Sequence, residues 1–381
     1  MTTEEVELLS ELTIVIQTYN RWSELEQMIE YLRDIPVTVH IIDGSNRPCF
    51  PIGQLSGTSS IIYHHVPNTN DEDPLAQWTK RLVFGASLPK TKFSVVGTDD
   101  DFLTISGLIA AIKCLNNNNL VDAVIGRVIL YRKEFKSISY CLRYPSGTDL
   151  IETEGSLIVQ RLSMSSSWFL YAVCKTEVWK KFIETTYETR SYSGSQIYAS
   201  EWMMYILSQT MFRTKNLDQI THLRLDTVSG KNISKGVNWA DWVGDENNID
   251  MFEDLTTQLA KGFNCVTPIA EHAANLEIAQ KLFETEKLRF DKSKKKPKLT
   301  MQNLFRRSVQ KCLPIEVRIW VGKWILAKVL PSERDYKPRK LKNFIKYISR
   351  SSILYDSAEL ESIETLLLKP REKLRLRSSI D

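Results

Sequence analysis

The sequence lacks the features of membrane-spanning, zinc-binding and disulfide-rich proteins. No stretch of its 381 residues approaches the ~18 consecutive apolar residues that a membrane-spanning helix needs. Its six cysteines are scattered, without any Cys-x-x-Cys pair, and this pattern favours reduced thiols over a zinc site or a disulfide framework. The first residues are acidic and contain no basic segment of a secretory signal. We therefore expect a cytoplasmic protein.

What the sequence does have is an uneven distribution of charge. The net charge of the whole chain is +4. Residues 1–280 hold 24 Lys and Arg against 34 Asp and Glu, a net charge of −10, whereas residues 281–381 hold 26 against 12, a net charge of +14. An asymmetry on this scale predicts an acidic body with a basic appendage for an anionic partner.

The most informative stretch runs from Phe93 to Phe102. An apolar, β-prone run ends in a glycine, and three adjacent carboxylates follow: Asp99, Asp100 and Asp101. Such a run predicts a buried strand, and ligands of open α/β sheets bind beyond the carboxyl ends of strands. Two interpretations are open at this point. The carboxylates hold a cation such as Mg²⁺, which binds one or two carboxylates and substrate phosphates, or they favour the positive end of the helix that begins near Thr104.

Strands and helices alternate along the first part of the chain. Apolar runs predict strands at Leu12–Gln17, Thr38–Ile42, Ser60–His65 and Ala123–Tyr131, besides the strand before the three carboxylates. Helical periodicity predicts helices at Trp22–Arg33, Leu75–Leu88 and Thr104–Leu115. This repeated order, with short joins, predicts an α/β fold with a mostly parallel sheet and helices on both faces.

After Tyr131 the pattern is less regular. Residues 135–165 are typical of hairpins or of an excursion over the sheet. The later part predicts strands at Trp168–Cys174 and Ile220–Asp226, helices at Thr176–Thr186, Ala199–Phe212 and Leu313–Leu330, and a charged linker at Lys292–Lys298. We therefore expect an α/β domain over residues 1–245, a helical segment packed on it over 246–291, and a basic helical extension over 292–381.

Three segments, in this order, resemble the GT-A glycosyltransferases, and most closely the family-2-like group that begins with a Pro-Thr-Tyr-Asn-Arg loop. The segments are Thr13 to Arg21 (TIVIQTYNR), Ile41 to Ser45 (IIDGS) and Gly97 to Phe102 (GTDDDF). The resemblance covers about residues 12 to 230, and Gln17 stands where the family usually has proline. It implies the GT-A fold, which is Rossmann-like, and transfer of a sugar from a nucleotide-sugar.

The resemblance also implies donor-binding roles for residues at strand ends. The loop after the first strand and the acidic residue after the second would hold the base and ribose; the candidates are Thr18, Tyr19, Asn20, Arg21 and Asp43. Asp99 and Asp100 would complete the donor site. Lys80 and Arg81 would reach the phosphates, although a solvated helix face is the simpler interpretation of either one.

A divalent metal, Mn²⁺ or Mg²⁺, is a further implication of the resemblance. Asp99 and Asp101 correspond to the Asp-x-Asp carboxylates that hold the metal and ribose, where a cation neutralises charge building on the diphosphate leaving group. Such enzymes often supply a histidine as a third ligand, and His222 stands at the matching place. A histidine on an alternating strand is as well explained as a hydrogen-bonded structural residue.

An inverting transferase needs a general base that takes the proton from the acceptor hydroxyl. In similar enzymes this base is a carboxylate at the start of a helix well beyond the Asp cluster, and Glu201 occupies that place. A first-turn glutamate that favours the helix dipole is the alternative. Many relatives have a Glu-Asp pair where this chain has Glu201 and Trp202.

We therefore expect an inverting, metal-dependent glycosyltransferase that moves a sugar to a glycan or lipid-linked acceptor, as in bacterial-type surface polysaccharide synthesis. Two alternatives stay open. One is nucleotidyl or phosphosugar transfer on the same fold, against which no Gly-rich phosphate loop lies near the first strand. The other is a catalytically inactive GT-A-like binding module.

The basic extension predicts a partner other than the substrates. Its Leu313–Leu330 helix carries tryptophans among lysines and arginines, a composition that suits peripheral contact with the anionic cytoplasmic face of a membrane. Packing of this helix on the body is the alternative. The extension contains no recognisable nucleic-acid-binding motif, so we expect no nucleic-acid partner.

Overall fold

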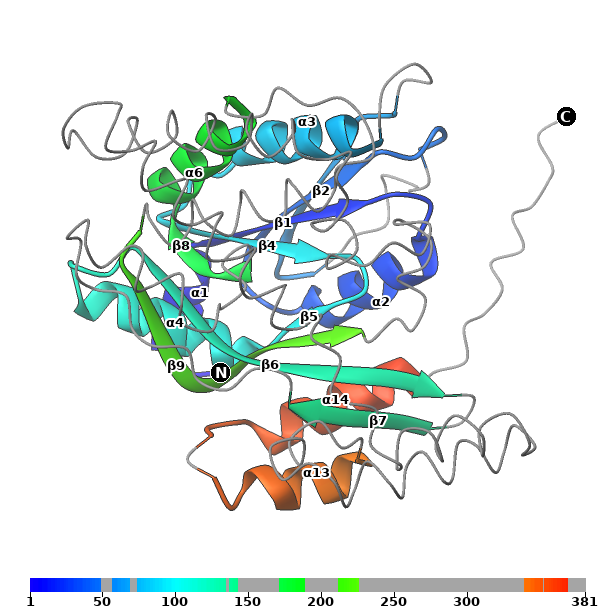
Figure 1. Cartoon of the computed structure of the whole chain (residues 1–381), viewed down its shortest axis with the longest axis vertical. Coiled ribbons are helices and arrows are strands. Elements are labelled where there is room, and N and C mark those ends of the chain that lie inside the picture. The colour runs from blue at the N-terminus through cyan, green and yellow to red at the C-terminus, as the bar shows by residue number, and fades with distance from the viewer. Residues whose placement is uncertain are drawn as a thin grey trace, which may run out of the picture.

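A computed structural model of the chain describes residues 1–48, 57–68, 74–134, 137–142, 171–188, 212–225, 339–351 and 353–368. These residues build a nine-stranded mixed sheet with helices against both faces (Figure 1). The predicted α/β fold, with a mostly parallel central sheet flanked by helices, is confirmed. Within the described ranges, no helix combines the length and the apolar character needed to cross a membrane.

Four parallel strands form one half of the sheet, in the order β3-β2-β1-β4. They are β1 (Leu12–Thr18), β2 (Thr38–Asp43), β3 (Ser60–His65) and β4 (Phe93–Thr98). β1 and β4 are buried almost throughout, which explains why their sequences are nearly continuous apolar runs. Gln17 pairs with both Ile42 and Thr98, so β1, β2 and β4 end side by side.

The other half of the sheet mixes strand directions. β8 (Val173–Lys175) runs antiparallel to β4 and to β6 (Ala123–Glu134), whereas β6 is parallel to β9 (Thr214–Leu225). β7 (Ser137–Leu142) pairs antiparallel with β6, and the two-residue β5 (Phe102–Leu103) pairs with β9. The last pairing sets His222 opposite Leu103, close to the end of the carboxylate cluster.

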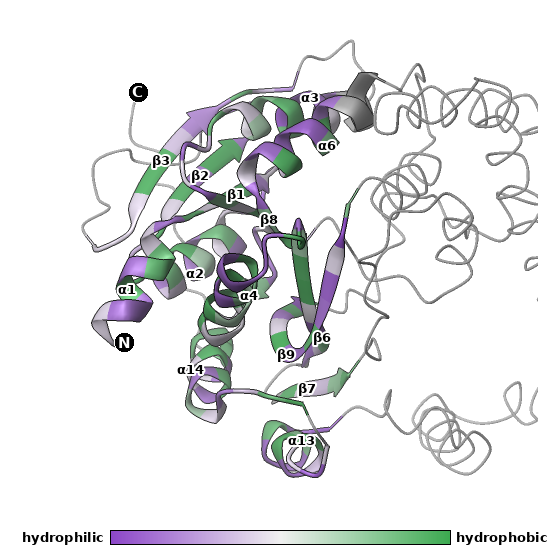
Figure 2. Cartoon of the chain, turned by 90° about the vertical axis from the view of Figure 1, so that its left-hand side faces the viewer, coloured by the Kyte–Doolittle hydropathy of each residue, from purple (hydrophilic) through white to green (hydrophobic). Residues whose placement is uncertain are grey.

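Helices cover the sheet in two layers, which Figure 2 shows from a second direction. α3 (Pro74–Ser87) and α6 (Thr176–Glu188) lie on one face; α1 (Thr3–Ser10), α2 (Trp22–Leu32) and α4 (Ile105–Asn117) lie on the other. α4 approaches β9 closely because Gly107 has no side chain. A Cβ on Gly107 would lie 2.4 Å from the carbonyl oxygen of Ile220.

Two C-terminal helices, α13 (Leu341–Ile348) and α14 (Ser357–Leu368), are built into this body. Phe344 of α13 and Ile363 of α14 are fully buried in the same apolar core as β1 and α2. α13 packs against β7 and α14 against α2. Tyr140 and Arg339 exchange backbone hydrogen bonds of 2.7 and 2.9 Å. Part of the predicted basic extension therefore belongs to the folded α/β body.

The predicted Leu313–Leu330 helix, the predicted helical segment over 246–291, the Lys292–Lys298 linker, and all but the last residue of the predicted Ala199–Phe212 helix lie outside the described residues. The boundaries predicted near residues 245 and 292 therefore stay predictions. The predicted strand at Ile220–Asp226 matches only the later part of β9, which begins six residues earlier, at Thr214.

Candidate functional site

The three adjacent carboxylates follow β4 at the edge where β1 and β2 also end. Asp99 and Asp101 are each 4% exposed. The hydroxyl of Thr18, the last residue of β1, donates to Asp99 Oδ2 at 2.8 Å. The parallel register thus brings together two segments that lie far apart in the sequence.

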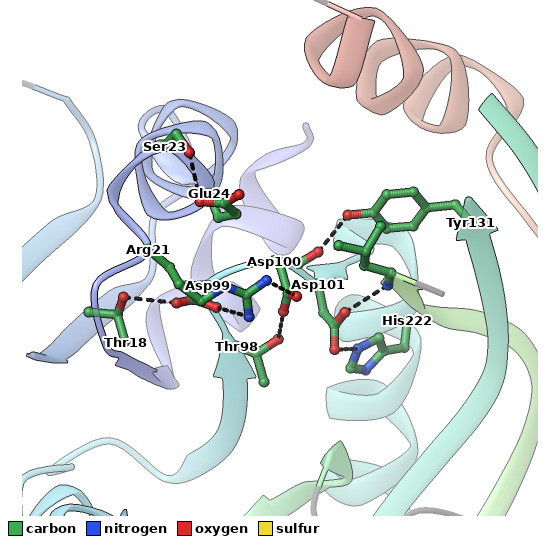
Figure 3. A network of polar contacts seen from close by, with 11 residues as sticks. Thr18, Arg21, Ser23, Glu24, Thr98, Asp99, Asp100, Asp101, Tyr131 and His222 are labelled. Atoms are coloured by element: carbon green, nitrogen blue, oxygen red, sulfur yellow. Dashed lines mark hydrogen bonds and ion pairs between the residues drawn. The ribbon is translucent and has the colours of Figure 1, made fainter. Parts of the chain in front are cut away.

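Arg21 contacts two of the three carboxylates (Figure 3). Its Nη1 lies 3.1 Å from Asp99 Oδ1, and its Nη2 donates to Asp100 Oδ2. The preceding residue, Asn20, has a φ angle of 55°, which is uncommon for a residue with a side chain, and its N–H donates to Ser45 Oγ at 2.8 Å. These contacts tie the loop after β1 to both neighbouring loops.

Arg21 does not fully offset the negative charge of the buried carboxylates. Burial raises the pKa of Asp99 to about 7, although Arg21 and Thr18 favour its ionised form. Burial, followed by the charge of Asp101, also raises the pKa of Asp100. Burial therefore opposes ionisation of Asp99 and Asp100 more strongly than Arg21 favours it.

Asp101 contacts β9 instead of Arg21. Its Oδ1 accepts the N–H of Leu225 at 2.9 Å, and its Oδ2 lies 3.2 Å from Nε2 of His222. Burial alone would raise the pKa of Asp101, but the His222 ring and the Leu225 N–H outweigh burial and lower it. His222 is 2% exposed. Neither of its ring nitrogens makes a well-aligned hydrogen bond within the part of the chain that the structure describes.

A two-ligand metal site at Asp101 and His222 fits these distances. The described residues contain no group of three or more His, Cys, Asp or Glu side chains that could hold a metal ion. The 3.2 Å between Asp101 Oδ2 and His222 Nε2 is an ion-pair distance, and both atoms could instead bind one divalent ion such as Mn²⁺. Such ions commonly take few protein ligands and fill the shell with water and phosphates. Asp99, the other predicted ligand, contacts Thr18 and Arg21 instead.

Tyr131, which the sequence analysis did not single out, holds the backbone of the cluster. Its hydroxyl donates to the carbonyl oxygen of Asp100 at 2.5 Å, and its ring packs on Phe102. Burial, followed by the charges of Asp101 and Asp100, raises the pKa of Tyr131, so the hydroxyl stays a donor. No local pattern signals this role, because Tyr131 lies within an apolar strand and its partner lies 31 residues earlier.

A second polar cluster surrounds Asp43 at the end of β2. Asp43 is fully buried; its Oδ1 accepts the N–H of Ser45 at 2.8 Å, and its Oδ2 accepts the hydroxyl of Tyr63 at 2.5 Å. The N–H of Gly44 donates to the carbonyl oxygen of Thr18 at 3.0 Å. Asp43 thus shapes the loop that lies beside the end of β1.

Arg81, on α3, lies directly against this loop. It is 6% exposed, its Nη1 donates to Asn68, and its Nε has no partner among the described residues. A Cβ on Gly44 would lie 2.5 Å from the guanidinium carbon of Arg81, so a side chain at this position would displace the guanidinium. Burial lowers the pKa of Arg81, against the charges of Asp43 and Tyr19. A buried guanidinium with so few acceptors is suited to binding a carbonyl or phosphate oxygen.

The structure therefore assembles the predicted residues into two adjoining groups. Thr18, Arg21, Asp99 and Asp100 form one, which Asp101 links to His222, and Asp43 and Arg81 lie in the other, with Tyr19 close enough to affect Arg81. Asn20 joins the two groups through Ser45. Lys80 lies exposed on α3. Glu201 lies outside the described residues, so its role as general base stays a prediction.

No family model and no curated protein matches the chain. Among solved structures, it is similar to S. aureus TarS 1-349, with 12% identity, a TM-score of 0.46 and coverage of 78% of each chain. The same protein is similar in complex with UDP-GlcNAc, with 11% identity, a TM-score of 0.45 and coverage of 70% of each chain. In complex with UDP it has 11% identity and a TM-score of 0.43, over 70% of this chain and 69% of TarS 1-349. Similarities this distant assign no family or activity to the chain.

Proposed function

We propose that the chain is a glycosyltransferase that moves a sugar from a nucleotide-sugar to a glycan or lipid-linked acceptor. The observation that carries this proposal is the meeting of three loops at one edge of the sheet. These loops follow β1, β2 and β4, and the three segments that resemble family-2-like GT-A enzymes in sequence run from these strands into the loops. Thr18 bonds Asp99, and Asn20 bonds Ser45, so the loops form one connected surface.

In this proposal, the nucleoside binds at the loops after β1 and β2. Tyr19 is 44% exposed there and offers an aromatic face and a hydroxyl. Asp43 is fully buried, and we assign it the role of fixing the Ser45 loop rather than of direct contact. The Nε–H of Arg81 has no partner among the described residues, and such a donor suits an oxygen acceptor of a base or ribose.

The diphosphate would bind at the carboxylate cluster. Arg21 keeps 39% of its side chain exposed and has five N–H donors, more than its two carboxylate contacts use. Asp101 and His222 would hold Mn²⁺ or Mg²⁺ beside the diphosphate, where the ion supplies Lewis-acid stabilisation of the leaving group. Burial raises the pKa values of Asp99 and Asp100. The divalent ion, a second positive charge beside Arg21, would stabilise their ionised forms.

The proton of the acceptor hydroxyl would pass to a general base in an inverting reaction. We propose Glu201 for this role, as the sequence position predicts. The acceptor is proposed to be a glycan or a lipid-linked glycan, since the resemblance, rather than any described residue, supports this class.

The test is a thermal-denaturation screen of the full chain with a panel of UDP-, GDP-, CMP- and dTDP-sugars, each with and without Mn²⁺. A ligand that binds only the folded state raises its unfolding midpoint by mass action. We expect one nucleotide series to raise the midpoint, and to raise it more with Mn²⁺. The matched free sugars serve as controls. A panel in which no nucleotide-sugar changes the midpoint at millimolar concentration would contradict the proposal.

A further inference from the structure

A carboxylate from the C-terminal helix α14 lies at the helix that follows the three aspartates. Glu359 accepts three hydrogen bonds from the first turn of α4: one from the N–H of Ile105, one from the N–H of Ser106 at 3.2 Å and one from the Ser106 hydroxyl at 2.7 Å. These groups lie 254 and 253 residues away in the sequence. Most helices cap their first N–H groups with a neighbouring side chain, so a cap from so distant a residue is a specific tertiary link.

The N-cap residue of α4 does not accept the N–H groups of Ile105 and Ser106. Thr104 is the N-cap residue, and its hydroxyl accepts the N–H of Gly107 at 3.3 Å. The N–H groups of Ile105 and Ser106 precede that contact and have Glu359 as their acceptor. A carboxylate at this end of a helix is also favoured by the helix dipole. α4 begins four residues after Asp101, so Glu359 fixes the place where the chain passes from the three aspartates into α4.

Tyr31 of α2 completes this link. Its hydroxyl lies 2.6 Å from Glu359 Oε1 and 3.0 Å from the carbonyl oxygen of Leu103. Its ring meets the ring of Phe102 edge to face, with centroids 5.3 Å apart. α2 begins directly after Arg21, which holds Asp99 and Asp100. One carboxylate on α14 therefore contacts both helices that border the aspartates, and Gln27 of α2 adds a bond to the Leu366 carbonyl at 3.3 Å.

We propose that Glu359 is a positioning residue for the site: through Tyr31 and the first turn of α4, it holds the Asp99–Asp101 segment in register with Arg21 and His222. It touches no reacting group. The effect of Glu359 on catalysis rests on the proposed function. Its effect on the order of the Asp99–Asp101 segment does not. It gives the C-terminal region a role in the site, beyond covering the core.

The test compares Glu359→Gln with Glu361→Gln in the full chain. Both variants remove one negative charge from α14, but Glu361 is exposed, and its carboxylate contacts neither α2 nor α4 in any described interaction. Hydrogen–deuterium exchange measures the order of residues 98–108 directly. We expect exchange at Ile105 and Ser106 to become roughly tenfold faster in Glu359→Gln, the effect of losing a charged hydrogen bond on local opening, and to be unchanged in Glu361→Gln.

Steady-state rates with the nucleotide-sugar found in the screen supply the second readout. We expect Glu359→Gln to lower kcat/KM for the donor at least about fivefold, because the segment that it positions is the one proposed to bind the diphosphate and the metal, while the acceptor KM stays within about twofold. Tyr31→Phe, which removes only the hydroxyl, should give a smaller change of the same kind. Both readouts are taken well below the unfolding midpoint of each variant, so that global unfolding does not contribute.

Unchanged exchange at Ile105 and Ser106 in Glu359→Gln would overturn the structural link. Faster exchange with an unchanged kcat/KM for the donor would overturn the positioning role but leave the proposed function intact. A wild-type chain that turns over no nucleotide-sugar would contradict the proposed function, and the exchange measurement would still decide whether Glu359 orders the segment.

Discussion

Asp101 differs from the two carboxylates beside it in what it contacts. Arg21 holds Asp99 and Asp100, whereas Asp101 accepts the N–H of Leu225 and faces His222. Alanine at this position would remove the acceptor of that partly buried N–H and so lower folding stability. Asparagine keeps an oxygen acceptor for it, and so it is the substitution that separates the loss of a metal ligand from the loss of folding stability.

We expect Asp101→Asn to abolish stimulation by Mn²⁺ and to lower turnover at least about a hundredfold, since Lewis-acid stabilisation contributes several kcal/mol. Initial rates against Mn²⁺ concentration measure the effect. Asp218→Asn is the control, because Asp218 pairs with Arg127 in an exposed contact on β9 and β6. Wild-type activity that persists in excess EDTA, or an Asp101→Asn variant with the same Mn²⁺ response, would argue against a metal at this position.

Glu201, the proposed general base, gives a second prediction for a single residue. Glu201→Gln should reduce turnover roughly a hundredfold or more, the usual contribution of a general base, with little change in donor affinity because the proton is taken from the acceptor. Rates at saturating acceptor, with donor affinity from calorimetry, separate the two. If the variant turns over normally, the base is another carboxylate, and Asp226 and Asp241 are the next candidates for substitution.

Individual contacts were predictable only where they follow from strand order. Thr18, Asp43 and Asp99 stand at the ends of apolar runs, and parallel strands end at one edge of a sheet, so their proximity could be expected. The contact of His222 with Asp101 was anticipated only through the family resemblance. Tyr131 and Glu359 carry no local signal, because each binds a backbone group of a distant segment. The bulk of the C-terminal region lies outside the described residues.

At the scale of elements, the β2–β3 pair contains a cross-strand histidine contact whose protonation affects stability. His40 Nδ1 lies 3.0 Å from His64 Nε2. Burial, followed by the charge of His64, lowers the pKa of His40 from 6.5 to about 4, and burial also lowers the pKa of His64. Between these values the unfolded chain binds a proton that folded His40 does not, so folding stability must fall as the pH is lowered through this range.

We therefore expect His40→Gln to flatten the dependence of the unfolding free energy on pH between about 6.5 and 4. One proton contributes at most about 1.4 kcal/mol per pH unit to that slope. Urea denaturation at a series of pH values measures it. His64→Gln leaves His40 titratable but removes its charged neighbour, so it should flatten the slope less. Parallel pH profiles for wild type and His40→Gln would show that His40 is not the group involved.

The whole molecule combines an acidic first part with a basic last part, but the structure does not divide it at that boundary. α13 and α14 lie in the basic region and pack into the core. Removing residues 292–381 would therefore strip buried side chains such as Phe344 and Ile363, and such a truncation cannot test the predicted contact with an anionic membrane. Substitution of exposed basic residues is a less disruptive test, because Lys342 and Lys346 of α13 and Arg350, two residues beyond its end, are all exposed.

We propose that these basic residues take part in peripheral membrane binding and predict that the chain co-sediments with phosphatidylglycerol vesicles at low salt. Each basic residue near an anionic surface contributes about 1 kcal/mol. Replacing Lys342, Lys346 and Arg350 together by glutamate should therefore weaken binding at least about a hundredfold. Replacing exposed Lys90, Lys180 and Lys181 on the body in the same way is the control. Equal loss in both triple variants would indicate a non-specific charge effect, and no binding by the wild type would remove the membrane from consideration.

The most direct test of the central claim is the release of nucleotide by the purified full chain from the nucleotide-sugar that stabilises it. In the presence of Mn²⁺ or Mg²⁺, we expect release of the nucleoside diphosphate, slow with water and faster with a glycan acceptor, and its loss in Asp101→Asn. Nucleotide-sugar binding without any release, with or without metal and acceptor, would contradict a transferase and leave a GT-A-like binding module.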